Sequence, residues 1–195
     1  MTRTIEFLFD VGSPTTYLAH KRLAGVAQRS GARVDYVPVL LGGIFKATGN
    51  ASPAMVPAKG IHMFTDMGRY ADRHGIMLRN NPHFPINTLT MMRMLAGMKG
   101  KPGFAKLVDT LFNAMWETPR NMGDPAELAA VLTAAGLDAD AMLAAASDPD
   151  AKAALVAATE SAVARGAFGA PTFFVDGAMY FGQDRLDWVE EAAAA

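Results

Sequence analysis

The chain has 195 residues, of which 51% are hydrophobic, and a formal net charge of −1 at pH 7. This length fits one domain, or one domain with a large insertion, and the balanced charge gives no electrostatic reason to expect a nucleic acid or a membrane surface as partner. The sequence contains no cysteine, which excludes disulfides, thiolate metal ligands and a catalytic thiol among its own side chains. We expect no metal site, and any sulfur nucleophile has to arrive with a small molecule.

The start of the sequence and its apolar stretches bear on localisation. The first residues run straight into a strand pattern, without a basic start followed by a long apolar run, so we expect no signal peptide. No apolar stretch approaches the roughly 20 residues that a membrane-spanning helix needs. The expectation is a soluble, cytoplasmic protein.

The first predicted elements form a strand–helix–strand unit. The apolar run from Ile5 to Phe9 predicts a buried strand. Ser13 then stands at an N-cap position with Pro14 at the first helical position, and apolar residues recur at helical spacing until Gly31, where the helix should end. Residues 33–40 predict a second strand. Such a unit forms a right-handed crossover with its two strands parallel.

The middle of the chain predicts helices for about a hundred residues. The Gly42-Gly43 pair breaks the pattern after the second strand, so we expect an irregular segment there. Two prolines and two asparagines make residues 80–85 irregular as well. The predicted helices cover residues 58–74, 87–98, 102–117, 125–135, 138–146 and 150–164.

Strands return near the end of the chain. Residues 172–175 and 178–181 predict a hairpin, because the two residues between them, Asp176-Gly177, are typical of a two-residue turn. A last helix is predicted for residues 183–193.

The order of these elements predicts the fold class. A β-α-β unit, a block of helices and a β-β-α unit form an α/β thioredoxin fold with a large all-helical insertion between its two halves. We assign residues 1–57 and 165–195 to the thioredoxin-like domain and residues 58–164 to an inserted helical domain.

The strongest candidate for chemistry is Ser13. Its hydroxyl and several unpaired backbone N–H groups are predicted at the positive end of a helix, just beyond a strand, and this geometry binds anions. A purely structural helix cap explains the same residues, so the local sequence leaves both interpretations open.

The stretch that carries Ser13 also resembles a known active-site turn. Phe9-Asp10-Val11-Gly12-Ser13-Pro14-Thr15-Thr16-Tyr17 is similar to the Phe-x-x-x-Cys-Pro-x-x-Tyr turn of DsbA-like thioredoxin-fold proteins, with Ser13 in the place of the first cysteine and Thr16 in that of the second. A turn without sulfur resembles the glutathione-using branch, the 2-hydroxychromene-2-carboxylate isomerases and the kappa-class glutathione transferases. The resemblance covers nearly the whole chain and implies glutathione as cofactor and a homodimer as assembly.

The resemblance also implies where glutathione binds. A cis Ala170–Pro171 bond is expected opposite Ser13, with the Ala170 backbone pairing with the cysteinyl part of glutathione. The stretch Phe181-Gly182-Gln183-Asp184 is expected to hold the γ-glutamyl end, and Lys59 the glycyl carboxylate. Without the resemblance, a trans proline, a capped helix start and a solvated lysine explain these residues.

A second group of residues is expected to face the substrate, a small aromatic carboxylate: Phe45, Lys46, Met55 and Phe84. Asn50 lies in the same loop region and is expected to contact glutathione. The sequence leaves open which of Phe45, Lys46, Asn50 and Met55 contact the substrate and which contact glutathione.

By this resemblance the activity is a glutathione-dependent cis–trans isomerisation. It interconverts 2-hydroxychromene-2-carboxylate and trans-o-hydroxybenzylidenepyruvate, as in aromatic degradation, and the Ser13 hydroxyl holds the glutathione sulfur ionised. Two alternatives stay open: a kappa-like transferase or peroxidase with the same glutathione site, and a non-catalytic thioredoxin-fold module that binds peptides.

Weaker candidates have simpler interpretations. His20, His62 and His74 fall inside predicted helices, where surface or half-buried positions explain them. The methionines around Met91–Met98 are interpreted as core residues, with the wall of an apolar substrate pocket as the alternative. Trp116 is expected in the core.

Overall fold

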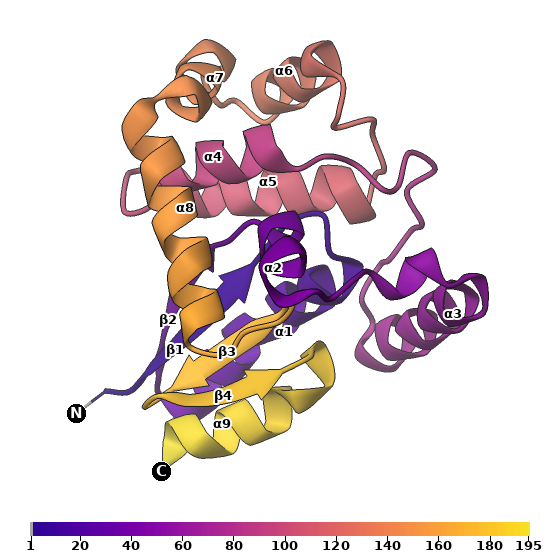
Figure 1. The fold of residues 1–195 in the computed structure, drawn as a ribbon, viewed down its shortest axis with the longest axis vertical. Helices are drawn as coiled ribbons and strands as arrows, with labels where there is room; N and C mark the ends of the chain where they lie inside the picture. The colour runs from indigo at the N-terminus through magenta and orange to yellow at the C-terminus, as the bar shows by residue number, and fades with distance from the viewer. Residues whose placement is uncertain (1) are drawn as a thin grey trace.

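The computed structural model describes residues 2–195 as a four-stranded sheet with helices on both of its faces and a helical block beside it (Figure 1). The strands are β1 (Thr4–Phe9), β2 (Arg33–Pro38), β3 (Thr172–Val175) and β4 (Ala178–Phe181). The α-helices are α1 (Pro14–Ser30), α2 (Leu41–Thr48), α3 (Pro57–His74), α4 (Leu89–Met98), α5 (Phe104–Trp116), α6 (Pro125–Ala134), α7 (Ala139–Ser147), α8 (Pro149–Ala164) and α9 (Leu186–Ala194). Two short 3₁₀ turns are η1 (Pro53–Met55) and η2 (Gln183–Arg185).

The sheet has the order β2-β1-β3-β4. β1 and β2 are parallel, whereas β1 with β3 and β3 with β4 are antiparallel. The predicted β-α-β and β-β-α units are therefore confirmed, and β1 lies inside the sheet, between β2 and β3.

Successive side chains of β1 point to opposite faces of the sheet, as strand geometry requires. Ile5, Phe7 and Phe9 belong to the large core that also contains the buried side chains of α1, α5 and α9. Leu8 belongs to a smaller core with Ile44 of α2 and with α8. Both faces of the central strand are thus covered, and the turn after Phe9 emerges between two packed layers.

Most helix boundaries follow the predicted signals. Ser13 caps α1 and Gly31 ends it with a φ of 69°, in the left-handed region that glycine tolerates. The hairpin between β3 and β4 turns at Asp176 and Gly177, both with positive φ, as the predicted two-residue turn requires.

One predicted irregular segment is a helix. α2 runs through the Gly42-Gly43 pair, which was expected to break the pattern. The helix is held by contacts that are remote in sequence: the Asp10 carboxylate accepts a hydrogen bond from the Leu41 N–H at 2.8 Å, and Ile44 is fully buried. Tertiary contacts override the low helix propensity of glycine here. Smaller differences are that β2 ends at Pro38 and that the last helix opens with the 3₁₀ turn η2.

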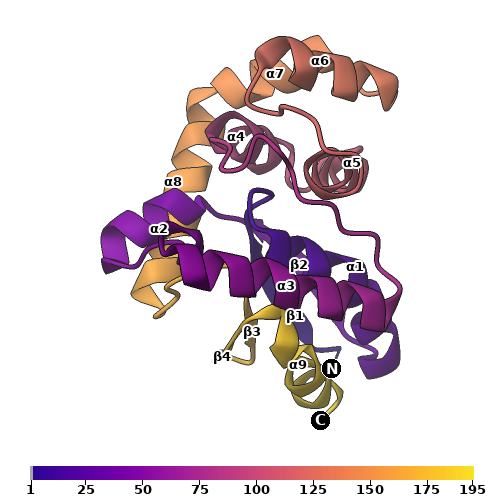
Figure 2. The same ribbon diagram turned by 90° about the vertical axis from the view of Figure 1, so that its right-hand side faces the viewer.

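The helical block α4–α8 packs above the sheet and is continuous with its core (Figure 2). Phe112 of α5 lies 5.9 Å from Phe9 and 6.1 Å from Tyr17, measured between ring centroids. Met91, Met92 and Met94 are buried in this core, which confirms their interpretation as core residues. Within residues 2–195, no helix has both the length and the apolar character needed to cross a membrane.

Candidate active site

Ser13 sits in the turn between β1 and α1, where the chain leaves the sheet. Its own backbone is extended, its side chain is nearly buried, and its Oγ accepts a hydrogen bond from the Thr16 N–H at 3.2 Å. Pro14 follows at the first helical position, as predicted. The serine therefore is an N-cap, and its hydroxyl stands at the positive end of a 17-residue helix.

A second segment meets this turn from the far end of the chain. The Ala170–Pro171 bond is cis, and the Ser13 hydroxyl donates a hydrogen bond to the Ala170 carbonyl at 3.3 Å. A cis proline in contact with Ser13 was predicted, and the structure confirms it. The Ser13 Oγ also lies 3.0 Å from the Thr15 Oγ1.

These two segments open onto a cavity of about 660 Å³, a size typical of small-molecule sites. Its floor is the Ser13 turn and the Ala170–Pro171 segment, and its walls come from α2, α3, the loop before α4 and the start of η2. Of the predicted site residues, those that line it are Ser13, Phe45, Asn50, Phe84, Ala170, Pro171, Phe181, Gly182, Gln183 and Asp184.

Three other predicted site residues do not line the cavity. Lys46 and Lys59 are exposed, on α2 and on the first turn of α3, and Met55 of η1 has 75% of its surface accessible. Lys46 follows directly on Phe45, which does line the cavity. Roles for these three residues in binding substrate or glutathione stay predictions.

Gly182, Gln183 and Asp184, at the start of η2, form a polar part of the cavity wall. Gly182 has a φ of 103°, a backbone conformation that favours glycine, and a Cβ at this position would also lie 2.5 Å from an Asp184 carboxylate oxygen. The Gln183 side chain is buried, and its Oε1 has no hydrogen-bond partner among the residues that the structure describes. The Asp184 carboxylate is paired with the neighbouring Arg185. An acceptor left unpaired in a buried position is a group that a ligand can satisfy.

Asn50 connects the loop after α2 to the segment before Ala170. Its side-chain amide donates to the Phe168 carbonyl at 2.8 Å, and its Oδ1 accepts from the Ala51 N–H. Phe168 in turn packs on Phe181, with 4.4 Å between the ring centroids. A Cβ on Gly169 would approach the Phe181 ring to 2.8 Å. The loop, the cis-proline segment and β4 are thus fitted closely together around the cavity.

Asp10 is a buried residue of the site that the sequence analysis did not single out. Its carboxylate accepts from the Gly12 N–H at 2.9 Å, from the Leu41 N–H at 2.8 Å and from the Thr88 hydroxyl at 3.1 Å. Burial raises the pKa of Asp10, and these three donors oppose the rise. One carboxylate therefore joins the Ser13 turn to the starts of α2 and α4.

The opposite wall, on α3, also was not predicted. The residues of α3 that line the cavity recur every three or four positions and so share one face of the helix: His62, Met63, Asp66, Met67 and Tyr70. This spacing was visible in the sequence, but a helix with one face on a cavity has the same pattern as a helix with one face on a core.

Trp116, expected in the core, is buried and donates from its Nε1 to the Val11 carbonyl at 2.8 Å.

Comparison with known protein families agrees with this geometry. The model of the DSBA-like thioredoxin domain matches residues 4–194. The chain belongs to the DSBA-like thioredoxin family. The family's fold, a thioredoxin sheet with a helical insertion, is the one that the order of elements predicts.

Two groups of curated relatives within this family match almost the whole chain. A 2-hydroxychromene-2-carboxylate isomerase of Sphingobium xenophagum is 32% identical over 97% of both chains, and one of Pseudomonas putida is 30% identical over 96% of this chain and 93% of its own. The human glutathione S-transferase kappa 1 is 29% identical over 96% of this chain and 89% of its own. The chain is therefore related to both isomerases and kappa-class transferases.

Solved structures show the same relationship. A 2-hydroxychromene-2-carboxylate isomerase superposes with a TM-score of 0.86 at 29% identity, covering 97% of this chain and 93% of its own. The cytosolic disulfide reductase DsbM of Pseudomonas aeruginosa, in a structure with GSH, has a TM-score of 0.64 at 15% identity, with coverage of 98% and 96%. At that identity, the second match shows the fold alone.

Proposed function

We propose that the protein is a glutathione-dependent isomerase that interconverts 2-hydroxychromene-2-carboxylate and trans-o-hydroxybenzylidenepyruvate. The observation that carries the proposal is the Ser13 hydroxyl at the positive end of α1, 3.3 Å from the carbonyl of Ala170, on the floor of a cavity large enough for two small molecules in contact. The relatives named as isomerases support the choice of reaction.

The residues around the cavity fit glutathione. The described chain offers no backbone acceptor to the Ala170 N–H, and this group and the Ala170 carbonyl suit pairing with the backbone of a small peptide. At the other end, the unpartnered Gln183 Oε1 and the Asp184 carboxylate suit the ammonium group of a γ-glutamyl unit. Asn50, in the loop after α2, lines the same cavity and donates to the carbonyl of Phe168, two residues before Ala170.

When bound, glutathione supplies a thiolate that adds reversibly to the conjugated side chain of the ring-opened substrate, so that a double bond becomes a rotatable single bond. Ser13 has the role of holding the sulfur in its ionised form. Lowering the pKa of a thiol by about 2 requires about 2.7 kcal/mol. A hydrogen bond to a charged group contributes about 1.5–3 kcal/mol and a helix terminus about 0.3–1 kcal/mol, which together suffice.

The rest of the cavity suits an aromatic carboxylate. Phe45 and Phe84 give it two aromatic rings, and Met63 and Met67 give it adaptable apolar surface. We extend the proposal to Lys46 as the group that attracts the substrate carboxylate and to Lys59 as the partner of the glycyl carboxylate of glutathione. We place the enzyme in the cytoplasm, as a homodimer, in aromatic catabolism.

Two measurements test the proposal. Calorimetry with glutathione should show saturable binding, whereas a non-catalytic module should show none at millimolar ligand. The absorbance of the chromene carboxylate should then change only when glutathione is present, with no loss of free thiol over many turnovers. A reaction that proceeds equally well without glutathione would contradict the proposal.

A kappa-like transferase is the second candidate, because relatives of that name match at 28–29% identity over 95–96% of this chain. It would use the same residues to bind and ionise glutathione. The two functions separate in one experiment with an electrophile such as a halonitrobenzene. A transferase consumes one glutathione per product, whereas the isomerase returns the thiol after each turnover.

A further inference from the structure

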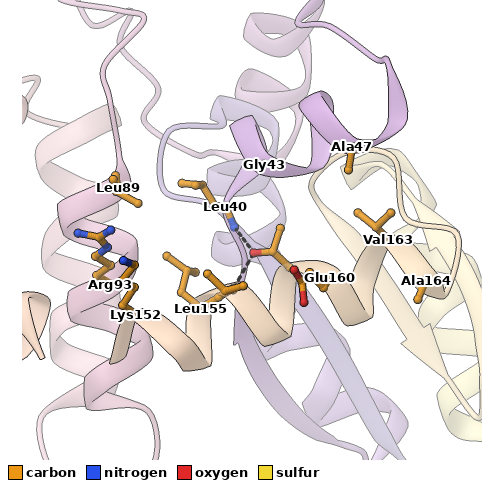
Figure 3. A pocket seen from close by; sticks show the side chains of 12 residues that line it. Leu40, Gly43, Ala47, Leu89, Arg93, Lys152, Leu155, Glu160, Val163 and Ala164 are labelled. Carbon is orange, nitrogen blue, oxygen red and sulfur yellow. Dashed lines mark hydrogen bonds between the residues drawn. The ribbon is translucent and has the colours of Figure 1, made fainter. Parts of the chain in front are cut away.

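A second cavity of about 440 Å³ lies between α2, α4 and α8 (Figure 3). It shares no lining residue with the Ser13 cavity. Its walls are aliphatic, without an aromatic side chain, and consist mainly of Leu40, Ala47, Leu89, Leu155, Val156, Val163 and Ala164. Its volume lies within the range of small-molecule sites, roughly 300–1,000 Å³.

The walls of this cavity are held in place by close contacts of α8. The Thr159 hydroxyl accepts from the Leu40 N–H at 3.0 Å and donates to the Leu155 carbonyl at 2.7 Å. A Cβ on Gly97 of α4 would lie 2.9 Å from the Cβ of Ala151, so α4 and α8 cross with almost no space between them. These contacts set the spacing of Leu40, α4 and α8 around the cavity.

Two cationic side chains stand at one end of the cavity. Figure 3 shows Arg93 and Lys152 together near the crossing of α4 and α8. Neither forms an ion pair with another residue of the described chain. The Arg93 Nε is buried and has no hydrogen-bond partner within residues 2–195. A buried donor without an acceptor is rare in folded proteins and marks a place where an acceptor is missing.

The positive and negative side chains of the cavity lie apart from each other. Glu160 is the acidic lining residue, and it lies eight residues beyond Lys152 on α8, which is about 12 Å along a helix axis. An anionic group is therefore attracted to the end with Arg93 and repelled from the end with Glu160. An arginine guanidinium matches the planar carboxylate in particular.

We propose that this cavity binds a monocarboxylate with an elongated aliphatic body, of the medium-chain fatty-acid type. The carboxylate is held by Arg93 and Lys152, and the chain lies along α8 between Leu89 and Val163. This site is separate from the Ser13 cavity, and its occupation depends on neither glutathione nor the isomerase reaction.

The test is calorimetric titration of the full chain with sodium decanoate, below the concentration at which decanoate forms micelles. One decanoate should bind per chain, and saturating glutathione should not displace it. Arg93→Met and Lys152→Met keep the apolar stems and remove the charge, so each should weaken binding about tenfold or more. Lys106→Met, which removes an exposed lysine of α5, should bind as the parent does, and 1-decanol should bind more weakly than decanoate.

The position of the ligand is read separately, from methyl resonances. Decanoate should shift the signals of Leu155 and Val163 and leave those of Met63 and Met67, in the Ser13 cavity, unchanged. The proposal is overturned by an absence of saturable binding, by equal affinity of Arg93→Met and the parent, or by shifts at Met63 and Met67 alone. It is also overturned if the chain self-associates through this face and excludes decanoate as it does so.

Discussion

The Ser13 hydroxyl makes the hydrogen bond of a capping residue and a second hydrogen bond that capping does not need. The Oγ accepts from the Thr16 N–H, which is the capping bond, while its proton points to the Ala170 carbonyl, 157 positions away in the chain. A cap is satisfied by the first contact alone. The second contact places the hydroxyl on the floor of the cavity, where a bound thiol would meet it.

Substitution of Ser13 separates its two roles. If the hydroxyl donates to a bound thiolate, Ser13→Ala removes about 1.5–3 kcal/mol of bonding and raises the pKa of the bound thiol by about 1–2. Turnover at neutral pH should then fall by about ten- to a hundredfold and recover toward alkaline pH, as the thiol ionises unaided. Ultraviolet titration of the thiolate and the rate against pH measure both effects.

The control for this experiment is Ser13→Gly. Glycine caps a helix almost as well as serine but has no hydroxyl to donate. Ser13→Gly should therefore show the same rise in thiol pKa as Ser13→Ala, with a smaller loss of thermal stability. An unchanged thiol pKa in both variants would leave Ser13 with the capping role alone.

Asp184 is expected to bind a part of glutathione that does not react. Asp184→Ala should therefore weaken glutathione binding, while turnover at saturating glutathione stays nearly unchanged, because the lost interaction is equal in the ground state and the transition state. Steady-state kinetics with varied glutathione measure both quantities. Asp140→Ala, which removes an exposed aspartate of α7 that does not line the cavity, is the matched control. A fall in turnover with an unchanged glutathione requirement would assign Asp184 another role.

The sequence revealed Ser13 and Pro171 but not Asp10, and the difference is physical. Ser13 and Pro171 belong to short local motifs through which the resemblance to DsbA-like proteins identifies them, although the local residue types alone also fit a plain helix cap and a trans proline. Asp10 depends on donors from Leu41 and Thr88, which become neighbours only after folding. Nothing in the residues next to Asp10 indicates that contact.

At the scale of elements, predictions succeeded where caps and periodicity agree. α1 and α3 have proline at the start and glycine at the end, and the structure places their boundaries within a residue of the prediction. α2 has no capping side chain, and glycine occupies its second and third positions. It forms because Asp10 binds its first N–H and because Gly43 allows close packing on Thr159, which are tertiary contacts.

Glu6 of β1 forms an ion pair with Arg165 at the end of α8, and the contribution of this pair to the free energy of unfolding should depend on pH. Arg165 binds Glu6 with two hydrogen bonds, at 2.7 and 2.8 Å, and this bonding lowers the pKa of Glu6. A carboxyl whose pKa is lower in the folded state stabilises the fold above its unfolded pKa, about 4.3, and loses that contribution as pH falls through the folded value. Glu6→Gln should therefore reduce the free energy of unfolding above about pH 5 and have little effect in stronger acid.

Urea unfolding between about pH 3 and pH 7 measures this difference. Both side chains are about one-third exposed, so the effect is that of a partly screened pair and should decrease with added salt. Glu191→Gln, at an exposed position of α9, is the control. A difference between parent and Glu6→Gln that is the same at every pH would show that the charge of Glu6 does not stabilise the fold.

At the scale of the whole molecule, the inserted helices and the sheet share one core. Phe112 packs on Phe9 and Tyr17, and Trp116 binds the Val11 carbonyl beside Ser13. The two parts of the chain therefore share buried side chains, and their division into a thioredoxin-like domain and a helical domain stays a prediction. The Ser13 turn packs against the inserted helices.

This shared core predicts a single unfolding transition. In differential scanning calorimetry, the calorimetric and van't Hoff enthalpies should agree, because neither part can lose its core and leave the other intact. Trp116→Phe removes the indole donor and should lower the midpoint of that one transition without splitting it. Two separate transitions, one of them assigned to residues 58–164 by hydrogen exchange, would show that the domains are independent.

The strand order has a consequence for the order in which the protein is made. β1 lies between β2 and β3, but about 130 residues separate β2 from β3 in the chain. At about 5–20 residues per second, a ribosome needs roughly 7–26 s to add them. During that time one edge of the apolar strand β1 has no partner, and an open strand edge invites aggregation. Glu6 is the charged residue of that strand, and a charged side chain on an open edge opposes aggregation. The Ser13 site is completed only when Gly182–Asp184 have been added, in the last tenth of the chain.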